Sequence, residues 1–235
     1  MSNLVSNQSA DLTQYEHPFV TVDVVIFSLA LREGDLRVLL IEREREPFCN
    51  VLALPGGFVH VGETLEDSAE RQLRTKTSLS SVYMEQLFTF GNPTRDPRNH
   101  VLTVAYFALV PSDMIKLSEM GERLELVSVF DLPTLAFDHL EIVQLALQRL
   151  RYKLEYTSLG FELLPDRFTL TELQRAYEIV LSETLDKRNF RRKILSAEII
   201  EPTGETLRGG EGRPAKLFRY RDDAIAEVKT RRLFP

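Results

Sequence analysis

Residues 55–79, PGGFVHVGETLEDSAERQLRTKTSL, contain the signal that decides the fold of the first part of the chain. Near the start of this stretch Gly56 and Gly57 free the backbone for dihedrals that other residues avoid. Thr64 then has an acidic residue three positions on, as at a helix N-terminus, and apolar residues recur every four positions from Leu65 to Leu73. The stretch therefore predicts a glycine-rich loop followed by a helix with one buried face.

Apolar runs around this loop and helix predict six strands. They cover residues 19–31, 36–41, 51–54, 82–90, 101–110 and 124–130, and several are rich in the β-branched residues that favour strands. The first two runs are separated by the turn sequence Arg32-Glu33-Gly34-Asp35, which predicts a β-hairpin. Apolar residues at helical spacing predict a further helix over residues 139–154. Strands mixed with helices indicate the α/β class.

The last third of the chain has a different pattern. Residues 169–181 and 187–195 are predicted helices, and residues 198–207 and 215–220 are predicted strands around a glycine-rich turn. A helix, a short helix and a glycine-tipped hairpin outline a winged helix-turn-helix. The chain therefore divides into three predicted parts: an N-terminal arm (residues 1–18), a first domain (19–153) and a winged helix-turn-helix domain (154–235).

Charge is distributed unevenly along the chain. The 235 residues have a net charge of −6. Up to position 150 there are 12 basic and 21 acidic residues, and after it there are 17 basic and 14 acidic residues. An acidic first part and a basic second part indicate two parts with different partners.

Cysteine content and hydrophobicity exclude several classes of protein. The single cysteine, Cys49, excludes an intrachain disulfide and a cysteine-based zinc site, which fits a reducing compartment. Residues 1–16 have no signal-peptide pattern. The longest apolar runs reach about ten residues, roughly half of what a membrane-spanning helix needs. We expect a soluble, cytoplasmic protein with no membrane partner.

Part of the chain matches the spacing of a known motif, the Nudix box. The box runs Gly, five residues, Glu, seven residues, Arg-Glu, an aliphatic residue, one residue, Glu-Glu, one residue, Gly and an aliphatic residue. The matching residues are Gly57, Glu63, Arg71, Leu73 and Leu79. Over about residues 19–150 the chain thus resembles the Nudix hydrolase family, which implies a Nudix α/β/α sandwich with a mixed sheet.

The box of this chain lacks the metal-binding glutamates of the family. Gln72, Thr75 and Lys76 stand at those positions, which share one helical face at i, i+3 and i+4. Magnesium and manganese need oxygen ligands, usually carboxylates, to activate water and neutralise charge on a diphosphate. We therefore expect no metal site, no cofactor and no catalytic residue, and a domain that binds its ligand without turnover.

A relocated metal site would make the domain an active enzyme. The carboxylates of Glu63, Glu66 and Glu70 could form a relocated metal site, although solvated glutamates that complement a helix N-terminus have the same pattern. An active, metal-dependent hydrolase of ADP-ribose or another nucleoside diphosphate is therefore the alternative function.

A site built for a nucleoside diphosphate needs backbone N–H groups and cations around the phosphates. The candidate ligand-binding residues are Arg43, Arg45, Gly56, Gly57, Phe58, Val59, Arg95 and Arg98. For Arg43 and Arg45 the alternative is a solvated strand end, and for Arg95 and Arg98 it is a structural Asp-Pro turn. Asp138-His139 is interpreted as a helix start rather than as a metal site.

Residues 187–193, KRNFRRK, contain five cations and no acid. At helical spacing Phe190 and Ile194 face a core, which leaves the polar residues on the outer surface. Arginine reads guanine and asparagine reads adenine, while the remaining cations contact phosphate. The candidate DNA-binding residues on this helix, the helix before it and the hairpin are Thr169, Thr171, Lys187, Arg188, Asn189, Arg191, Arg192, Lys193, Arg208, Arg213 and Lys216. A solvated charged face or a protein-interaction module is the alternative.

An acidic small-molecule domain joined to a basic winged helix resembles the Nudix-related transcriptional regulators of NAD metabolism, the NrtR family. Phe58-Val59, Phe137-Asp138-His139 and residues 168–193 carry the resemblance, which covers nearly the whole chain. It implies a homodimeric repressor that binds double-stranded operator DNA at NAD biosynthesis genes and is released by ADP-ribose or a related molecule. The two-fold symmetry of such a dimer predicts a palindromic operator, with half-sites about ten base pairs apart or a multiple of that.

Overall fold

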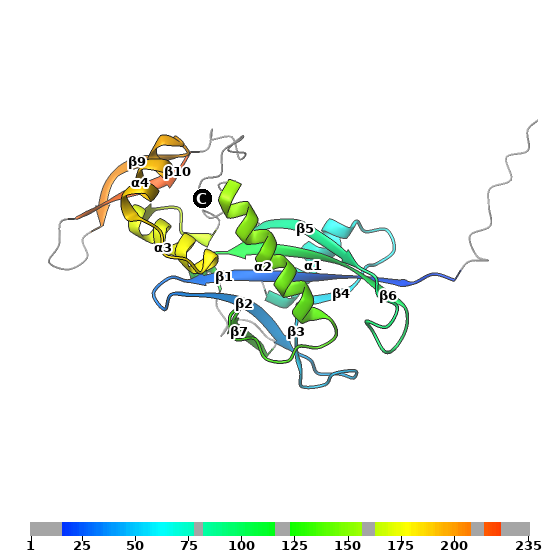
Figure 1. Ribbon diagram of the computed structural model, residues 1–235. Helices are drawn as coiled ribbons and strands as arrows, with labels where there is room; N and C mark the ends of the chain where they lie inside the picture. The colour runs from blue at the N-terminus through cyan, green and yellow to red at the C-terminus, as the bar shows by residue number, and fades with distance from the viewer. Residues whose placement is uncertain (1–15, 78–81, 116–122, 157–162, 208–213, 222–235) are drawn as a thin grey trace, which may run out of the picture.

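The first domain is built on a mixed sheet of seven strands (Figure 1). The computed structural model describes residues 16–77, 82–115, 123–156, 163–207 and 214–221. The strands are β1 (Phe19–Ala30), β2 (Asp35–Glu42), β3 (Leu52–Ala53), β4 (Gly56–Phe58), β5 (Tyr83–Phe90), β6 (Val101–Val110) and β7 (Leu124–Ser128). The main order is β3-β2-β1-β6-β5, with β4 paired to β1 and β7 paired to β2. Only β1 and β6 pair in parallel among these strands.

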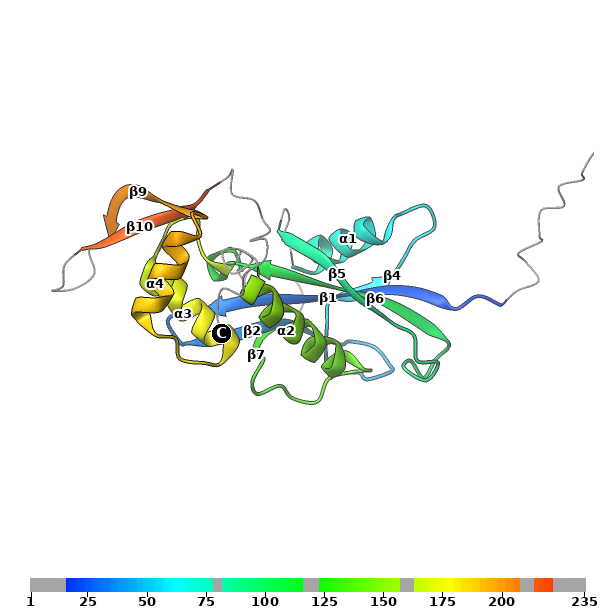
Figure 2. The ribbon, with the colours of Figure 1, turned by 45° about the horizontal axis from the view of Figure 1, so that its top comes forward.

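Helices cover both faces of this sheet. The helix α1 (Leu65–Thr77) lies on one face and α2 (His139–Tyr156) on the other (Figures 1 and 2). Alternate residues of β1 therefore enter different cores: Val24 packs beneath α1 and Val25 beneath α2. A strand that is buried on both faces has to be apolar almost throughout, which explains the long apolar run in the sequence. A short 3-10 helix, η2 (Ser112–Met114), follows β6.

The second domain has two helices and a three-stranded sheet. Its elements are β8 (Phe168–Thr169), α3 (Leu170–Leu181), α4 (Lys187–Ser196), β9 (Ile200–Leu207) and β10 (Ala215–Tyr220). The sheet order is β8-β10-β9, so the strand that leads into α3 is paired with the hairpin. Both helices begin with a side-chain cap: Thr169 and Glu172 form a capping box on α3, and Asp186 accepts from the Asn189 N–H on α4.

The two domains are joined through one continuous hydrophobic core. Buried residues of α3 and α4 belong to the same cluster as the residues beneath α2. Two arginines add polar contacts across the joint. Arg151 on α2 donates to the Val180 carbonyl oxygen (2.8 Å) and to the Ser182 hydroxyl (3.0 Å) at the end of α3. Arg175 on α3 donates to the Arg32 carbonyl oxygen (3.1 Å) in the turn after β1.

The sequence-based elements are confirmed with small changes at their ends. The predicted strand over residues 51–54 is shorter, because only Leu52 and Ala53 pair with β2. The predicted strand over residues 198–207 starts two residues later, since Glu198 has φ 54° in the left-handed region. The short strands β4 and β8 were not predicted. No helix among the described residues has the length and apolar composition needed to cross a membrane.

Candidate ligand cavity and nucleic-acid interface

A cavity of about 210 Å³ opens between β1, β4, the loop before β6 and the start of α2. Six of the eight predicted ligand-binding residues line it: Arg43, Gly56, Gly57, Phe58, Arg95 and Arg98. The other lining residues are Thr21, Asp23, Ile41, Leu54, Asp96, Val101, Phe137 and His139. The cavity therefore brings arginine, carboxylate, imidazole and aromatic groups together.

Arg45 and Val59 are not among the lining residues. The Arg45 carbonyl oxygen accepts a hydrogen bond from Nη2 of Arg43 (3.4 Å). The Val59 side chain packs against the core beneath α1, and its N–H donates to the Val20 carbonyl oxygen (3.0 Å). Both residues therefore stabilise the backbone next to the cavity and do not form part of its wall.

Close contacts leave no room for a side chain at the two glycines of β4. A Cβ on Gly56 would lie 2.1 Å from Oδ1 of Asp23 and 2.6 Å from the Val22 carbonyl oxygen. A Cβ on Gly57 would lie 2.6 Å from the Gln72 amide. Because real Cβ contacts are essentially never this short, a side chain at position 56 would push β4 away from the β1 backbone, and one at position 57 would displace the Gln72 amide.

Arg95 is the centre of a buried charge cluster beside the cavity. Its side chain is 4% exposed, and it donates two hydrogen bonds to the Asp138 carboxylate (2.6 and 2.8 Å). Its Nη2 also lies 3.5 Å from Oδ2 of Asp23. Burial alone would lower the pKa of Arg95, but the hydrogen bonds to Asp138 and the charge of Asp23 raise it. The cluster joins β1, the loop before β6 and the start of α2 to one another.

His139, the first residue of α2, is neutral and has a defined tautomer. Burial lowers its pKa, and the nearby Asp23 carboxylate only partly opposes this effect. The Leu54 N–H donates to Nδ1 (2.9 Å), so the ring proton is on Nε2. Nε2 lies 3.7 Å from Oδ2 of Asp23. The prediction of a helix start at Asp138-His139 is confirmed.

Two arginines lie over the aromatic side of the cavity. The Arg43 guanidinium is 4.7 Å from the centroid of the Phe137 ring, and the Arg98 guanidinium is 5.9 Å from the centroids of Phe58 and Phe137. Arg98 is 46% exposed and forms a two-pronged pair with Asp96, at 2.6 and 2.9 Å. These hydrogen bonds from Arg98 lower the pKa of Asp96. An exposed, already oriented guanidinium of this kind suits a phosphate group.

The loop after β2 packs against Phe137 of the cavity wall. The Phe48 ring packs edge-on against the Phe137 ring, with 4.9 Å between centroids. Phe48 and Phe137 both have positive φ, 66° and 54°, and this backbone conformation is costly for bulky residues. Cys49 follows Phe48 and is half-buried with a free thiol.

Two of the three substituted Nudix-box positions differ from the arrangement expected from the sequence, and the side chain of the third, Lys76, lies outside what the structure describes. Gln72 is buried, 5% exposed, and lies against Gly57. Thr75 is exposed, and its hydroxyl donates to the Arg71 carbonyl oxygen of the same helix (2.7 Å). Because Gln72 faces β4 and Thr75 faces solvent, the two side chains are not presented together.

The three glutamates that could have formed a relocated metal site do not converge. Glu63 is held by Arg71 at 2.5 and 3.0 Å, and this hydrogen bonding lowers the pKa of Glu63 to about 2. Glu66 accepts a hydrogen bond from the Tyr106 hydroxyl (3.2 Å), and Glu70 is exposed. Within the described part of the chain, no group of three or more histidine, cysteine, aspartate or glutamate side chains is arranged to hold a metal ion.

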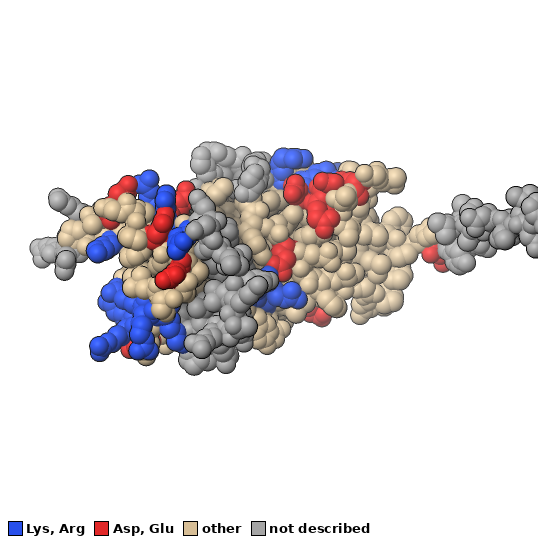
Figure 3. Space-filling view, turned by 90° about the horizontal axis from the view of Figure 1, so that it is seen from above, with Lys and Arg blue, Asp and Glu red and all other residues tan. Residues whose placement is uncertain are grey.

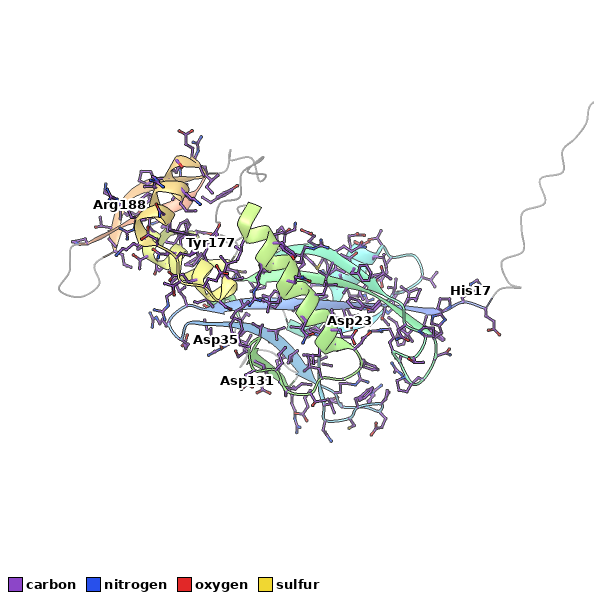
Figure 4. All side chains as sticks on the ribbon, in the orientation of Figure 1. His17, Asp23, Asp35, Asp131, Tyr177 and Arg188 are labelled. Carbon is purple, nitrogen blue, oxygen red and sulfur yellow. The ribbon has the colours of Figure 1, made fainter. Side chains whose placement is uncertain are left out.

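The basic surface of α4 lies at the other end of the molecule. Arg188 on α4 is far from Asp23 of the cavity (Figure 4), and Lys and Arg side chains gather at this end of the space-filling view (Figure 3). Phe190 and Ile194 are 1% and 0% exposed, as predicted. Lys187 and Arg188 are exposed and form no ion pair with any described carboxylate.

Other predicted DNA-binding residues on α4 are already oriented by neutral partners. Nη2 of Arg192 donates to Oδ1 of Asn189 (3.0 Å). Nη2 of Arg191 donates to the hydroxyl of Thr171 (3.2 Å), which is exposed on the first turn of α3. Lys193 is half-buried in the last turns of α4. These contacts leave the arginines charged without neutralising them, so the face keeps its positive potential.

The remaining predicted DNA-binding residues fall into three situations. Thr169 is 5% exposed and its hydroxyl accepts from the Glu172 N–H (3.1 Å), so its side chain is used in the cap of α3 and is absent from the basic face. Lys216 is exposed at the start of β10. Arg208 and Arg213 lie outside the described residues.

Sequence reasoning missed several residues of the cavity wall, notably Asp23, Phe137 and His139. It also missed Asp138, which holds Arg95 beside the cavity. One signal was present: Asp23 interrupts an apolar strand, and a buried carboxylate has to be paired. Its partner Arg95 is 72 positions away along the chain, so the pairing itself could not be found from local spacing.

The fold and the two sites define a class of protein: a Nudix-fold domain with a polar cavity, joined to a winged helix with a basic helix face. In agreement, the NUDIX domain family matches residues 20–146, and the NrtR DNA-binding winged helix domain matches residues 160–220. An ADPR responsive transcriptional repressor NtrR of Acinetobacter baylyi is 41% identical over 226 residues, covering 92% of this chain and 89% of that protein. The chain belongs to the NrtR family of Nudix-related regulators.

The solved structures that are similar to this chain include two of Shewanella oneidensis NrtR. Shewanella oneidensis NrtR complexed with a 27mer DNA is 33% identical, with a TM-score of 0.79 over 89% of this chain and 99% of that one. The NUDIX domain of Shewanella oneidensis NrtR complexed with ADP ribose is 34% identical, with a TM-score of 0.52 over 64% of this chain and 99% of that one.

Proposed function

We propose that this protein is a transcriptional repressor that binds operator DNA through its winged helix and is controlled by ADP-ribose in the cavity. The observation that carries the proposal is the basic face of α4, whose apolar side is buried while Lys187 and Arg188 stay exposed and unpaired with the described carboxylates. In a helix-turn-helix, the second helix binds in the DNA major groove through an exposed, positively charged face. The DNA complex of the Shewanella oneidensis relative supports this assignment.

The cavity supplies the groups that a nucleoside diphosphate needs. Arg98 and Arg43 offer positive charge to the phosphates, and the Phe58 and Phe137 rings offer faces for stacking. Arg95 is buried between Asp138 and Asp23, whereas Arg98 is exposed although it pairs with Asp96, so we assign Arg95 to shaping the cavity rather than to the phosphates. The ADP ribose complex of the relative's NUDIX domain supports ADP-ribose as the effector.

We also propose that the Nudix domain binds this ligand without hydrolysing it. The first metal position of the box is a buried glutamine, and Thr75 at the second position bonds its own helix. Neither group replaces a carboxylate as a ligand for magnesium. No cofactor is required for a cavity that only binds.

The same proposal includes the assembly. We propose a homodimer that places two α4 helices in successive major grooves of a palindromic operator at NAD biosynthesis genes, in the cytoplasm where that DNA lies. Within each chain the proposed boundaries are residues 1–18, 19–153 and 154–235. Ligand releases DNA only if it binds the DNA-incompatible arrangement more tightly, and a typical coupling of about 1 to 3 kcal/mol gives an effect of about five- to 150-fold.

One titration tests the function. The mobility of an operator fragment is measured with protein alone and then with added ADP-ribose. We expect a shift at low salt that ADP-ribose reverses. A steady, EDTA-sensitive hydrolysis of ADP-ribose would instead support a hydrolase, and the lack of any shift at low salt would support a protein-interaction module.

A further inference from the structure

Gln72 stands at the first lost metal position of the Nudix box, and its side chain is buried against β4. It is 5% exposed and is enclosed between α1 and β4. Its amide lies so close to Gly57 that no side chain fits between them. The Gln72 amide therefore needs hydrogen-bond partners within α1 and β4.

The neighbours of the Gln72 amide assign its orientation, because Nη1 of Arg71 can only donate and the Gly56 carbonyl oxygen can only accept. In the orientation that satisfies both, the amide nitrogen donates to the Gly56 carbonyl oxygen (3.0 Å) and the amide oxygen accepts from Nη1 of Arg71 (2.8 Å). Nη2 of Arg71 also donates to the Phe58 carbonyl oxygen (3.0 Å). Two consecutive residues of α1 thus hold the carbonyl groups at both ends of β4, and β4 carries Gly56, Gly57 and Phe58 into the cavity wall.

A glutamate could not make the same contacts. An ionised carboxylate only accepts hydrogen bonds, so it would meet the Gly56 carbonyl oxygen with no donor between them. A buried pair of facing acceptors costs far more than a typical hydrogen bond contributes. A protonated glutamate, in contrast, has one O–H to donate.

We propose that Gln72 is a positioning residue for ligand binding, which fixes β4 as a wall of the cavity in place of holding a metal ion. This inference rests on the proposed binding of ADP-ribose. It follows that restoring the family's glutamate at this position does not restore a metal site; it weakens the cavity.

Three variants of the full-length chain test the inference by calorimetric titration with ADP-ribose between pH 8 and pH 5.5. Gln72→Glu keeps the size but loses the donor at high pH. Gln72→Met has similar length, no donor and no charge. Thr75→Glu adds the same charge to the exposed side of α1 and is the matched control. Each is measured well below its own unfolding temperature, so that loss of folded protein does not contribute.

At pH 8 we expect Gln72→Glu and Gln72→Met to bind ADP-ribose about tenfold more weakly than the native chain, and Thr75→Glu to bind equally well. As the pH falls, Gln72→Glu should recover in part, because its protonated form can donate to Gly56 while the Arg71 guanidinium, itself paired with Glu63, favours the ionised form. Gln72→Met should stay weak throughout. A residue that only stabilised the fold would give no such pH profile in the dissociation constant.

The outcomes separate this inference from the proposed function. Native binding by Gln72→Met, or by Gln72→Glu at pH 8, overturns the positioning role. If Gln72→Glu does not fold, Gln72→Met decides alone. If the native chain itself does not bind ADP-ribose, the proposed function is wrong. The hydrogen bond to β4 is then tested by unfolding: the stability of Gln72→Glu should rise relative to that of Thr75→Glu as the pH falls. If the relative stability does not rise, the inference is overturned.

Discussion

The cavity and the α4 face both depend on arginine, but they use its charge in opposite ways. In the cavity Arg95 is buried against Asp138 and Asp23, and Arg98 is paired with Asp96. On α4, Lys187 and Arg188 form no ion pair with a described carboxylate, and Arg191 and Arg192 donate to a threonine hydroxyl and an asparagine amide. One site has its charges balanced in advance, and the other leaves them for a partner.

This difference predicts two kinds of recognition. Balanced, fixed charges recognise a ligand by the position of its groups, because the ligand has to match an existing arrangement. Unbalanced, exposed cations recognise a polyanion mainly by releasing its counterions, which makes binding strongly dependent on salt. The four experiments below test this contrast, from the largest expected effect to the smallest.

Arg95→Ala should have the largest effect, because it leaves two carboxylates close together without their cation. Breaking a buried pair costs about 3 to 5 kcal/mol of unfolding free energy, and the cavity should lose ADP-ribose binding with it. Urea unfolding and calorimetric titration measure the two effects. Arg98→Ala, at an exposed position, is the comparison: it should weaken binding with little loss of stability. Equal stability of both variants would contradict the buried cluster.

Arg188→Ala should weaken operator binding by about tenfold at moderate salt, corresponding to about 1.4 kcal/mol. If Arg188 contacts phosphate, the slope of log affinity against log salt also falls by about 1. Fluorescence anisotropy at several salt concentrations gives both values. The control is Arg123→Ala, which removes an exposed arginine already paired with Glu42 in the other domain. An equal loss in both variants would mean that net charge, rather than the α4 face, drives binding.

Arg151→Ala should reduce the communication between the two sites. Arg151 lies on the helix that begins at His139 in the cavity, and it bonds the end of α3. We expect ADP-ribose to bind with native affinity but to release DNA several-fold less effectively, within a coupling range of about 1 to 3 kcal/mol. Operator affinity with and without ADP-ribose measures this. Gln148→Ala, on the exposed side of the same helix, should leave the coupling unchanged.

His139 should make stability fall in mild acid. Its pKa is lowered in the folded chain by burial, so below its ordinary value of 6.5 the unfolded chain binds the extra proton and stability is lost as the pH falls. The slope is at most about 1.4 kcal/mol per pH unit. Urea midpoints at pH 7.5 and 5.5 should show this loss in the native chain and in His100→Asn, an exposed control, but less of it in His139→Asn. The same loss in all three would refute the assignment.

Local sequence patterns predicted the regular elements well. The apolar run over residues 101–110 became β6 without change, and the buried stripe from Leu65 to Leu73 became α1. In α4 the spacing of Phe190 and Ile194 correctly separated a buried side from a basic one. These predictions are correct because the periodicities of helices and strands can be recognised within a few consecutive residues.

The cavity was only half predictable, because its other half depends on contacts between distant segments. Arg43, Arg98 and the glycines were found from residue type and loop position. Asp138 and Asp23 were not, since only the folded sheet brings them to Arg95. For Gln72 the sequence identified a lost carboxylate but not its new role, which depends on how closely α1 approaches β4.

Cys49 gives the cavity a built-in attachment point for an optical reporter. It is the only thiol in the chain, it is partly accessible, and it follows Phe48, whose ring contacts Phe137 of the cavity wall. A thiol-reactive fluorophore would therefore label each native chain once, next to the residue that packs on the cavity wall. With a second fluorophore on the operator DNA, effector binding and operator release could then be followed in the same sample without a substitution in the chain.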